Sequence, residues 1–259
     1  MDVKSFDSLF ARLDDLRECA VRGNLGISAF FSPREALAAA EYLERCRASF
    51  ISFGGYSDAE RKKIYILPDF IEDAESVESI LEYGFSLDID CILISGSRFE
   101  TFSHRDVMGS ILALGVERDV IGDIVMLDNS RAVFFCESKL TPFFEGSIER
   151  IGRDKVSARR IELDEAVLPE RKVQKINDTV ASARLDCVVA ALCSLSRERA
   201  KEKISSSLVE LNYECEERPD KEVTVPATVS VRGVGKFKIL SLADKTRKGR
   251  YRLVAEKFL

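Results

Sequence analysis

Three short strings in the last third of the chain indicate how that part folds. In order they are Arg184-Leu185-Asp186, Ser196-Arg197-Glu198-Arg199-Ala200-Lys201 and Val231-Arg232-Gly233-Val234-Gly235-Lys236-Phe237. The first string opens a run with apolar residues at helical spacing, namely Leu185, Val188, Val189 and Leu192. Ser196 can cap a second helix, on which Ala200 and Ile204 continue an apolar stripe. The pattern predicts two short helices packed together, followed by β-strands.

Basic side chains border the apolar stripe of the second predicted helix. Arg197 and Lys201 lie four residues apart on one flank, and Arg199 and Lys203 do the same on the other flank. Such an array can straddle a phosphate backbone. For this helix alone, a solvated face whose cations are balanced by two glutamates is an equally good interpretation.

The strands that follow favour phosphate binding. In residues 228–239 basic and apolar residues alternate, which places Arg232, Lys236 and Lys238 on one sheet face. Gly233 and Gly235 permit a bulge or a close approach of RNA to the backbone. The basic surface continues around a hairpin turn predicted near Gly249, through Lys245, Arg247, Lys248, Arg250 and Arg252.

Charge is divided unevenly along the chain. Residues 180–259 contain 16 Lys and Arg against 11 Asp and Glu, whereas residues 1–179 contain 23 against 33. An acidic protein with a basic end suggests a polyanion as the partner of that end. If that end made six phosphate contacts, a fourfold rise in salt concentration would lower its binding affinity roughly a thousandfold.

Length and composition indicate an ordinary globular protein. The chain has 259 residues, of which 46% are hydrophobic and 32% charged, enough for two or three compact units. The opening residues lack the uninterrupted apolar core of a signal peptide, and no later run approaches membrane-spanning length, so we expect a cytoplasmic protein with no membrane insertion. Seven cysteines spread singly predict reduced thiols and no structural zinc site.

Residues 1–84 are predicted to form an N-terminal α/β unit. Apolar residues at helical spacing predict an opening helix, and Ser32 with Glu35 forms a capping box for a second helix that ends near Arg47. Strands are expected at residues 50–53 and 64–67. Between them, Gly54-Gly55 is read as a tight turn in preference to a phosphate-binding loop, and Ser57 with Glu60 can cap a further helical turn.

Residues 85–163 show the order strand, helix, strand, strand, helix, strand. We place strands near residues 89–95, 124–128, 132–136 and 155–163, with helices near residues 103–114 and 138–146. This order is typical of a split βαβ sandwich, as in RNA-recognition-motif domains. Since one of Phe134 and Phe135 must point to the core, at most one ring could stack on a base, and a scaffold role is favoured.

The enzyme signatures in the chain are incomplete. His104-Arg105-Asp106 has the letters of a kinase catalytic loop, but Ile111 stands where that loop needs asparagine, and no glycine-rich phosphate loop precedes it. Ser103 as an N-cap explains the triplet better. We therefore predict no catalytic residues, no metal and no cofactor.

Taken together, the motifs of the whole chain resemble a known family. After a polar linker at residues 164–181, residues 182–259 look like an S-four-type RNA-binding domain. The whole chain resembles the bacterial YlmH-type RNA-binding proteins, which join an N-terminal region, an RNA-recognition-motif-like domain and an S-four-type domain. The strings that carry this resemblance are Phe53-Gly54-Gly55-Tyr56 with Ala59-Glu60-Arg61, His104-Arg105-Asp106 with Gly109 and Leu114-Gly115, Gly122-Asp123-Ile124, and the three C-terminal strings quoted above.

The resemblance implies an α+β multi-domain fold and a set of RNA-facing residues. By position these are Ser196, Arg197, Arg199, Lys201, Lys203, Asn212, Arg232, Gly233, Lys236 and Phe237. Ser207 departs from the family, which commonly has glycine after the second helix, and is expected to cost stability at a left-handed backbone position. Arg184-Leu185-Asp186 is also similar to the catalytic string of pseudouridine synthases, but Ala183 and Ala191-Leu192 depart from that motif.

The preferred hypothesis is a non-enzymatic RNA-binding protein that docks on structured RNA, either rRNA or tRNA, on the large ribosomal subunit. The resemblance implies work in translation or ribosome quality control and, for some relatives, an association with cell division. One alternative is an RNA-modifying enzyme in residues 1–163 that uses the C-terminal domain for substrate delivery. Another is that the acidic N-terminal units bind a protein partner.

Overall fold

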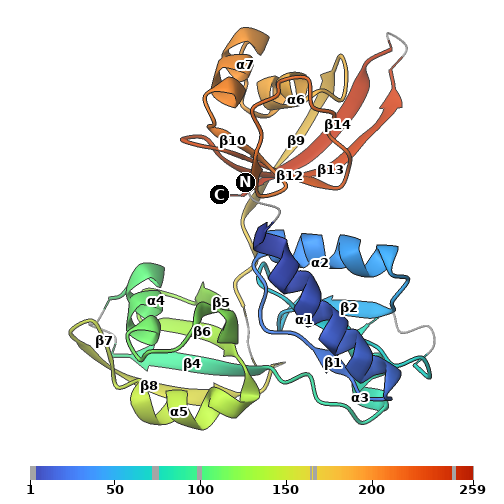
Figure 1. The fold of residues 1–259 in the computed structure, drawn as a ribbon. Coiled ribbons are helices and arrows are strands. Elements are labelled where there is room, and N and C mark those ends of the chain that lie inside the picture. Colours follow the sequence, from blue (N-terminus) through green and yellow to red (C-terminus); the bar gives the residue numbers. More distant parts are fainter. Residues whose placement is uncertain are drawn as a thin grey trace. The chain divides into compact units, whose positions relative to one another are not determined.

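The protein folds as helices and antiparallel sheets in two compact units. The computed structural model describes residues 4–71, 76–97, 101–163, 165, 168–246 and 249–258. One unit comprises residues 1–169 and the other residues 170–259 (Figure 1). This architecture confirms the predicted α+β multi-domain class.

The N-terminal part of the first unit is a small sheet covered by helices. Its elements are α1 (Lys4–Val21), β1 (Gly26–Ile27), α2 (Pro33–Arg45), β2 (Phe50–Phe53), β3 (Lys63–Ile66) and α3 (Val77–Glu82), with the strands in the order β1-β3-β2. The predicted capping box of α2 is confirmed. The Ser32 backbone N–H donates to the Glu35 carboxylate at 2.8 Å, and the Glu35 N–H donates to Ser32 Oγ at 3.3 Å.

The helical turn predicted at Ser57 to Glu60 does not form. The Asp123 carboxylate, from the neighbouring sheet, accepts the backbone N–H groups of Glu60 at 2.7 Å and Arg61 at 3.1 Å. These donors are therefore satisfied without a helix, and the segment stays a turn.

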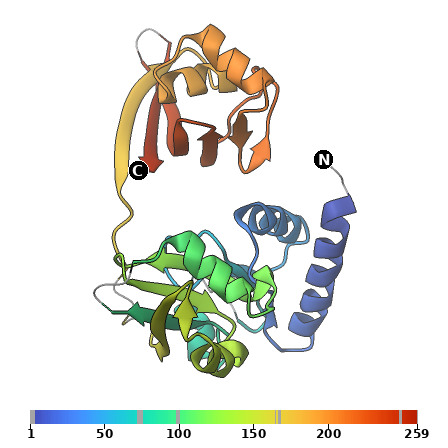
Figure 2. The ribbon, with the colours of Figure 1, turned by 90° about the vertical axis from the view of Figure 1, so that its left-hand side faces the viewer.

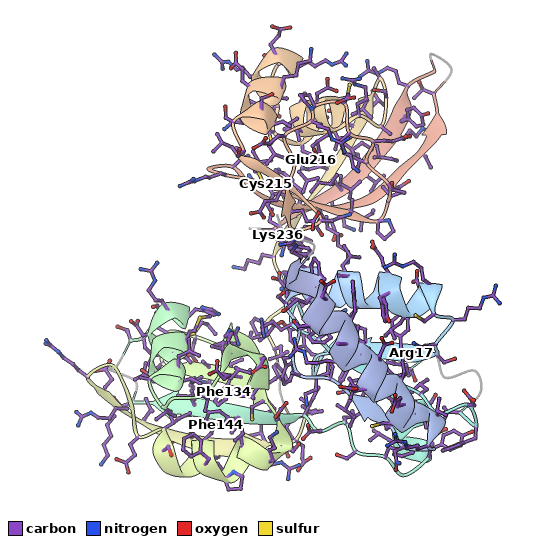
Figure 3. The ribbon with its side chains drawn as sticks, viewed as in Figure 1. Arg17, Phe134, Phe144, Cys215, Glu216 and Lys236 are labelled. Carbon is purple, nitrogen blue, oxygen red and sulfur yellow. The ribbon has the colours of Figure 1, made fainter. Side chains whose placement is uncertain are left out.

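The middle of the chain has the predicted order of strands and helices. Its elements are β4 (Asp90–Gly96), α4 (His104–Leu112), η1 (Arg118–Val120), β5 (Ile121–Met126), β6 (Arg131–Cys136), η2 (Ser138–Leu140), α5 (Thr141–Ser147), β7 (Arg150–Ile151) and β8 (Asp154–Ile161). The sheet order is β5-β6-β4-β8-β7, antiparallel throughout. Helices α4 and α5 cover one face, where Phe134 meets Phe144 edge to face at 5.2 Å (Figure 3).

The other face of this sheet is partly covered by the N-terminal part. Phe135 is fully buried, and its ring stacks on Tyr56 with the centroids 5.2 Å apart. The Tyr56 hydroxyl donates to Asp123 at 2.8 Å, which holds the turn against the sheet. The boundary expected at residue 84 therefore separates two layers that share one apolar core.

A buried lysine joins the same two layers. The side chain of Lys63, on β3, has no exposed surface, and its Nζ lies 2.7 Å from Asp88 and 3.6 Å from Glu137. A charge in such a place requires paired carboxylates, because desolvating an unpaired ammonium costs several kcal/mol. Since Asp88 and Glu137 flank strands of the second sheet, the ion cluster fixes how the two sheets pack.

The C-terminal unit is a six-stranded antiparallel sheet with two helices on one face (Figure 2). Its elements are β9 (Val173–Val180), α6 (Leu185–Leu192), α7 (Arg197–Ser205), β10 (Val209–Leu211), β11 (Glu214–Cys215), β12 (Ala227–Val231), β13 (Gly235–Lys245) and β14 (Tyr251–Phe258), in the sheet order β11-β10-β12-β13-β14-β9. The predicted linker of residues 164–181 is wrong over residues 173–180, which form a strand. All eight residues of β9 pair with β14 on one side, although most of their side chains are polar, and the other side of β9 is an edge of the sheet.

The turn glycine Gly55 is expected to be irreplaceable. Its φ is +100°, and a Cβ there would lie 2.3 Å from the Phe135 ring. Strain and overpacking together predict that Gly55→Ala lowers the free energy of unfolding by about 2–4 kcal/mol. Urea unfolding followed by circular dichroism measures this. The matched control is Gly146→Ala in α5, where a Cβ meets no atom within 4 Å. Equal stability of the Gly55→Ala and natural proteins would contradict the packing described.

Ser207 lies at the left-handed position expected for it, with φ of 57°. Replacement by glycine removes the strain of a side chain in that region, at the loss of the exposed Ser207 hydrogen bond to Glu217. We expect Ser207→Gly to stabilise the C-terminal unit by about 0.5–1 kcal/mol, measured by hydrogen-exchange protection of α7. The control Ser206→Gly, at φ of −96°, should not stabilise it. A loss of protection in Ser207→Gly would show that the hydrogen bond outweighs the strain.

Candidate nucleic-acid interface

Helix α7 presents the predicted basic residues on both sides of a buried stripe. Ala200 and Ile204 are fully buried against α6 and the sheet. Arg197 and Arg199 are exposed, whereas Lys201 and Lys203 are partly exposed. The Ser196 hydroxyl accepts the Arg199 backbone N–H at 3.3 Å, which confirms Ser196 as the N-cap. The helix therefore carries its four cations toward solvent, as the spacing predicts.

A buried carboxylate holds two arginines at the base of this helix. The Asp186 side chain is 0% exposed, whereas those of Arg184 and Arg197 are 40% and 50% exposed. Arg184 donates through Nε and Nη2 at 3.2 Å each. Arg197 donates through Nε at 3.1 Å, and its Nη2 lies 3.0 Å from the same carboxylate. Asp186 thus fixes two guanidinium groups that are still open to solvent.

The protonation of Asp186 follows from this geometry. Burial raises the pKa of the Asp186 carboxyl, but the hydrogen bonds from Arg184 and Arg197 outweigh burial and leave the pKa below its ordinary value of 3.8. The carboxylate is therefore charged at neutral pH. Arg184 was not among the RNA-facing residues predicted. Its position in the sequence, two residues before an aspartate at the start of a helix, is the feature that could have indicated this pairing.

The sheet contributes a second group of cations. Arg232 and Gly233 lie exposed in the turn between β12 and β13. In the β12–β13 pair, Lys236 stands opposite Ser230 and Lys238 opposite Thr228, on the face that alternates with the core. The Lys236 ammonium lies 4.9 Å from the Tyr213 ring centroid and 5.7 Å from that of Phe258 (Figure 3). Lys236 and Lys238 thus share one sheet face as predicted, whereas Arg232 lies in the turn and not on that face.

Two of the predicted RNA-facing residues have structural roles. Phe237 is 0% exposed and belongs to the core, because its position alternates with those of Lys236 and Lys238. Its assignment as an RNA-facing residue is therefore wrong. Asn212 has φ of 51°, and its side-chain oxygen accepts the Thr228 N–H at 2.9 Å, so this side chain ties the β10–β11 turn to β12.

The predicted hairpin turn is observed between β13 and β14, with Gly249 at φ of 73°. Arg247 and Lys248 lie outside the described residues. Arg250 donates to the backbone oxygen and hydroxyl of Thr179 on β9, and Arg252 is exposed on β14. The basic surface thus reaches the edge of the sheet.

The middle sheet offers no aromatic platform at the two positions considered for one. Phe134 and Phe135 are both 0% exposed, the first under α5 and the second under Tyr56. Neither ring can stack on a base unless the layers separate. This burial agrees with a scaffold role for the pair, which stays a prediction.

The groups considered for catalysis have structural explanations. His104 is the first residue of α4, and Ser103 with Asp106 forms the capping box of that helix. Burial raises the pKa of Cys91 and that of Cys136 to about 12, so both thiols are protonated at neutral pH. Among the described residues, no group of three or more His, Cys, Asp and Glu side chains is arranged to hold a metal ion. No described helix is long and apolar enough to span a membrane.

Comparison with known proteins places these observations in a family context. Residues 84–165 match the family described as "Putative RNA-binding domain in YlmH". Over 231 residues the chain is 26% identical to "Ribosome-associated protein quality control protein P2" of Bacillus subtilis (strain 168), which covers 89% of this chain and 86% of that protein. The predicted resemblance to YlmH-type RNA-binding proteins is confirmed.

A solved structure shares the fold. "Cell division protein ylmH from Streptococcus pneumoniae" matches with a TM-score of 0.50 at 19% identity, covering 64% of this chain and 96% of that chain. At this level of identity the match shows the fold alone.

Asp186→Asn tests the buried carboxylate. The substitution keeps the shape but removes the charge that pairs with Arg184 and Arg197, so we expect the C-terminal unit to lose about 1–3 kcal/mol at pH 7. Because the folded pKa of Asp186 is lowered, its contribution is complete above pH 3.8 and is lost as the pH falls through the folded pKa. Urea unfolding against pH measures both effects.

The matched control is Glu210→Gln, since Glu210 is exposed on β10 of the same unit. It should change stability little at any pH. A difference between Asp186→Asn and the natural protein that stays constant down to acid pH would contradict the pairing.

Proposed function

We propose that this protein binds structured RNA without catalysis and docks, through its C-terminal unit, on the rRNA or bound tRNA of the large ribosomal subunit. The proposal places it in the cytoplasm, in translation or ribosome quality control. The observation that carries it is the pair of arginines fixed by buried Asp186 on the helix pair that also carries the cations of α7. Lys236 and Lys238 add a second basic surface on the other face of the sheet.

The physical argument concerns the cost of ordering side chains. A flexible arginine loses rotamer freedom when it binds a phosphate, by up to about 2 kcal/mol. Arg184 and Arg197 are already held by Asp186, and each has N–H donors beyond the two that it uses there. Fixed guanidinium groups on a rigid helix pair suit RNA whose phosphates are also fixed, as in a folded ribosomal helix.

The names of the relatives support the same assignment. The Bacillus subtilis relative is named a ribosome-associated quality control protein, and the matched family is named as an RNA-binding domain. The Streptococcus pneumoniae structure is named a cell division protein, and a link of this chain to cell division is a further part of the proposal.

The first unit has a different part in the proposal. Its middle sheet acts as a scaffold, because the buried Phe135 is not available to RNA. The acidic balance of residues 1–179 disfavours phosphate contact and suits a protein partner. Burial raises the pKa of the Cys91 and Cys136 thiols to about 12, so neither of these two is an activated nucleophile, which supports binding over RNA modification through them.

Sucrose-gradient sedimentation of cell extract at low and moderate salt tests docking. The variant combines Arg197→Ala, Lys201→Ala, Arg232→Ala and Lys236→Ala. We expect the natural protein to travel with large subunits at low salt and the folded variant to stay at the top. Moderate salt should release the natural protein, because phosphate contacts displace condensed counterions.

A charge-matched control separates specific docking from net charge. It replaces four exposed arginines of the first unit by alanine, namely Arg12, Arg45, Arg105 and Arg153. This control should sediment with large subunits like the natural protein. If the natural protein also stays at the top at low salt, ribosome docking is wrong. If both variants are released equally, the C-terminal basic face is not the docking surface.

A further inference from the structure

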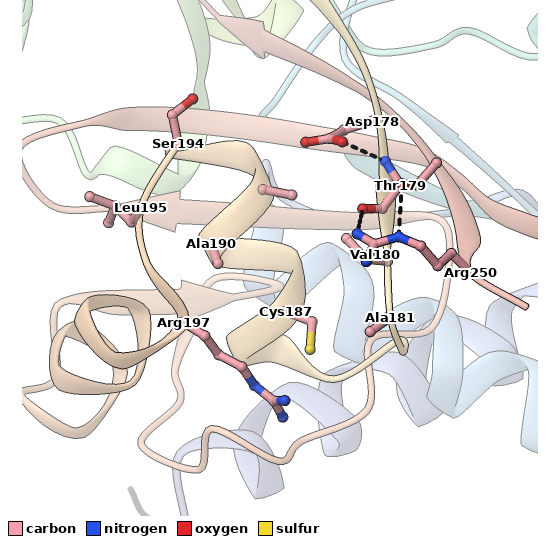
Figure 4. Close-up of a pocket in the computed structure, with 11 residues that line it drawn as sticks. Asp178, Thr179, Val180, Ala181, Cys187, Ala190, Ser194, Leu195, Arg197 and Arg250 are labelled. Atoms are coloured by element: carbon pink, nitrogen blue, oxygen red, sulfur yellow. Dashed lines mark hydrogen bonds between the residues drawn. The ribbon is translucent and has the colours of Figure 1, made fainter. Parts of the chain in front are cut away.

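A pocket of about 400 Å³ lies between helix α6 and strand β9 of the C-terminal unit (Figure 4). It exists because β9 is the edge strand of the sheet and α6 presents small side chains toward it. Ala190, Ala191 and Ser194 from the helix side and Ala181 from the strand side line the space. Its volume falls within the range of about 300–1,000 Å³ usual for small-ligand sites.

The edge of β9 beside the pocket is closed to an added strand. The Thr179 N–H donates to the Asp178 side chain at 2.6 Å, and the Thr179 carbonyl accepts from Arg250 Nη2. Arg250 Nε also donates to Thr179 Oγ1 at 3.0 Å. Since side chains already satisfy these backbone groups, a peptide that binds by strand addition is not the expected occupant.

Two held guanidinium groups line the pocket from different elements. Arg250 is fixed by Thr179 at the β9 edge, and Arg197 is fixed by buried Asp186 at the start of α7. Both arginines make these contacts through Nε and Nη2, so Nη1 takes no part in them. Planar groups of this kind bind phosphate oxygens with defined geometry.

The remaining polar groups distinguish a nucleotide from a bare anion. The Asp178 carboxylate also lines the pocket and would repel free phosphate. A ribonucleotide, in contrast, carries donors on its 2′-hydroxyl and base that a carboxylate accepts. The apolar small residues leave room for a flat base beside these groups.

We propose that this pocket binds one unpaired nucleotide of RNA. Arg197 and Arg250 hold the phosphates on either side of it, Asp178 accepts from its ribose or base, and the base lies against Ala190 and Ala191. This inference rests on the proposed function and adds Arg250, Asp178 and the α6 surface to the RNA-binding residues.

The test compares two RNA probes of equal length by fluorescence anisotropy, using the full chain. One probe is a hairpin with a seven-nucleotide unpaired loop, and the other is a fully paired duplex with the same stem. We expect the natural protein to bind the hairpin roughly tenfold more tightly, as one stacked or pocketed base would provide. Ala190→Leu should fill the pocket and bring the ratio close to one, with duplex affinity unchanged.

Two further variants guard against misfolding and nonspecific effects. Ser205→Leu adds the same side chain at an exposed site on α7 and should keep the tenfold ratio. Arg250→Gln should lower hairpin affinity severalfold more than duplex affinity. Circular dichroism and urea unfolding establish that each variant is folded.

Each outcome decides a separate claim. If folded Ala190→Leu keeps the hairpin preference, the pocket assignment is wrong while RNA binding stands. If the natural protein binds neither probe, the proposed function and this inference both fail. If a decaglutamate peptide binds more tightly than the hairpin and loses binding in Ala190→Leu, the pocket belongs to an acidic peptide.

Discussion

The buried carboxylate of Asp186 is the constraint on which the binding surface of the C-terminal unit depends. A charge with no exposed surface must be paired, and the pairing here comes from two arginines whose outer halves remain in solvent. The same interaction therefore neutralises the buried carboxylate and holds the two exposed guanidinium groups in place. It also connects the start of α6 to the start of α7, because Arg184 precedes one helix and Arg197 opens the other.

A second buried charge organises the first unit. Lys63 on β3 reaches the carboxylates of Asp88 and Glu137 beside the neighbouring sheet, and Phe135 from that sheet packs under Gly55 and Tyr56. These contacts cover part of the sheet face that an RNA-recognition-motif fold would otherwise offer to bases. The strand and helix order of an RNA-recognition motif is kept, but part of the sheet face that usually binds bases packs here against the N-terminal layer.

The two units are built from similar elements but differ in what covers the second face of the sheet. Each has an antiparallel sheet with helices on one face. In the first unit the second face is partly buried by another layer, whereas the second face of the C-terminal sheet carries Lys236 and Lys238. The division of charge along the chain follows this difference, since the basic end of the chain forms the unit whose second sheet face is left open.

Local patterns in the sequence determined most of the elements. Capping boxes at Ser32 and Ser103, the N-cap at Ser196 and the left-handed Ser207 were all predictable, because each depends on residues within one turn of chain. Strand alternation likewise placed Lys236 and Lys238 on one face and should have placed Phe237 in the core. The family resemblance places Phe237 among the RNA-facing residues, but its burial follows the strand alternation.

Only the tertiary structure decided which contacts cross between distant segments. The polar side chains of residues 173–180 predict a linker, whereas pairing with β14 makes this segment the edge strand β9. The turn after Gly55 was read as a helix start because its partner, Asp123, lies more than 60 residues away. The pocket beside α6 likewise needs both β9 and Arg250. The sequence by itself determined most of the helices and strands and the basic end of the chain, since these follow from neighbouring residues. Only the tertiary structure shows that Phe135 is buried, that Arg197 is held by Asp186 and that a pocket lies beside α6. These features depend on contacts between segments far apart in the sequence.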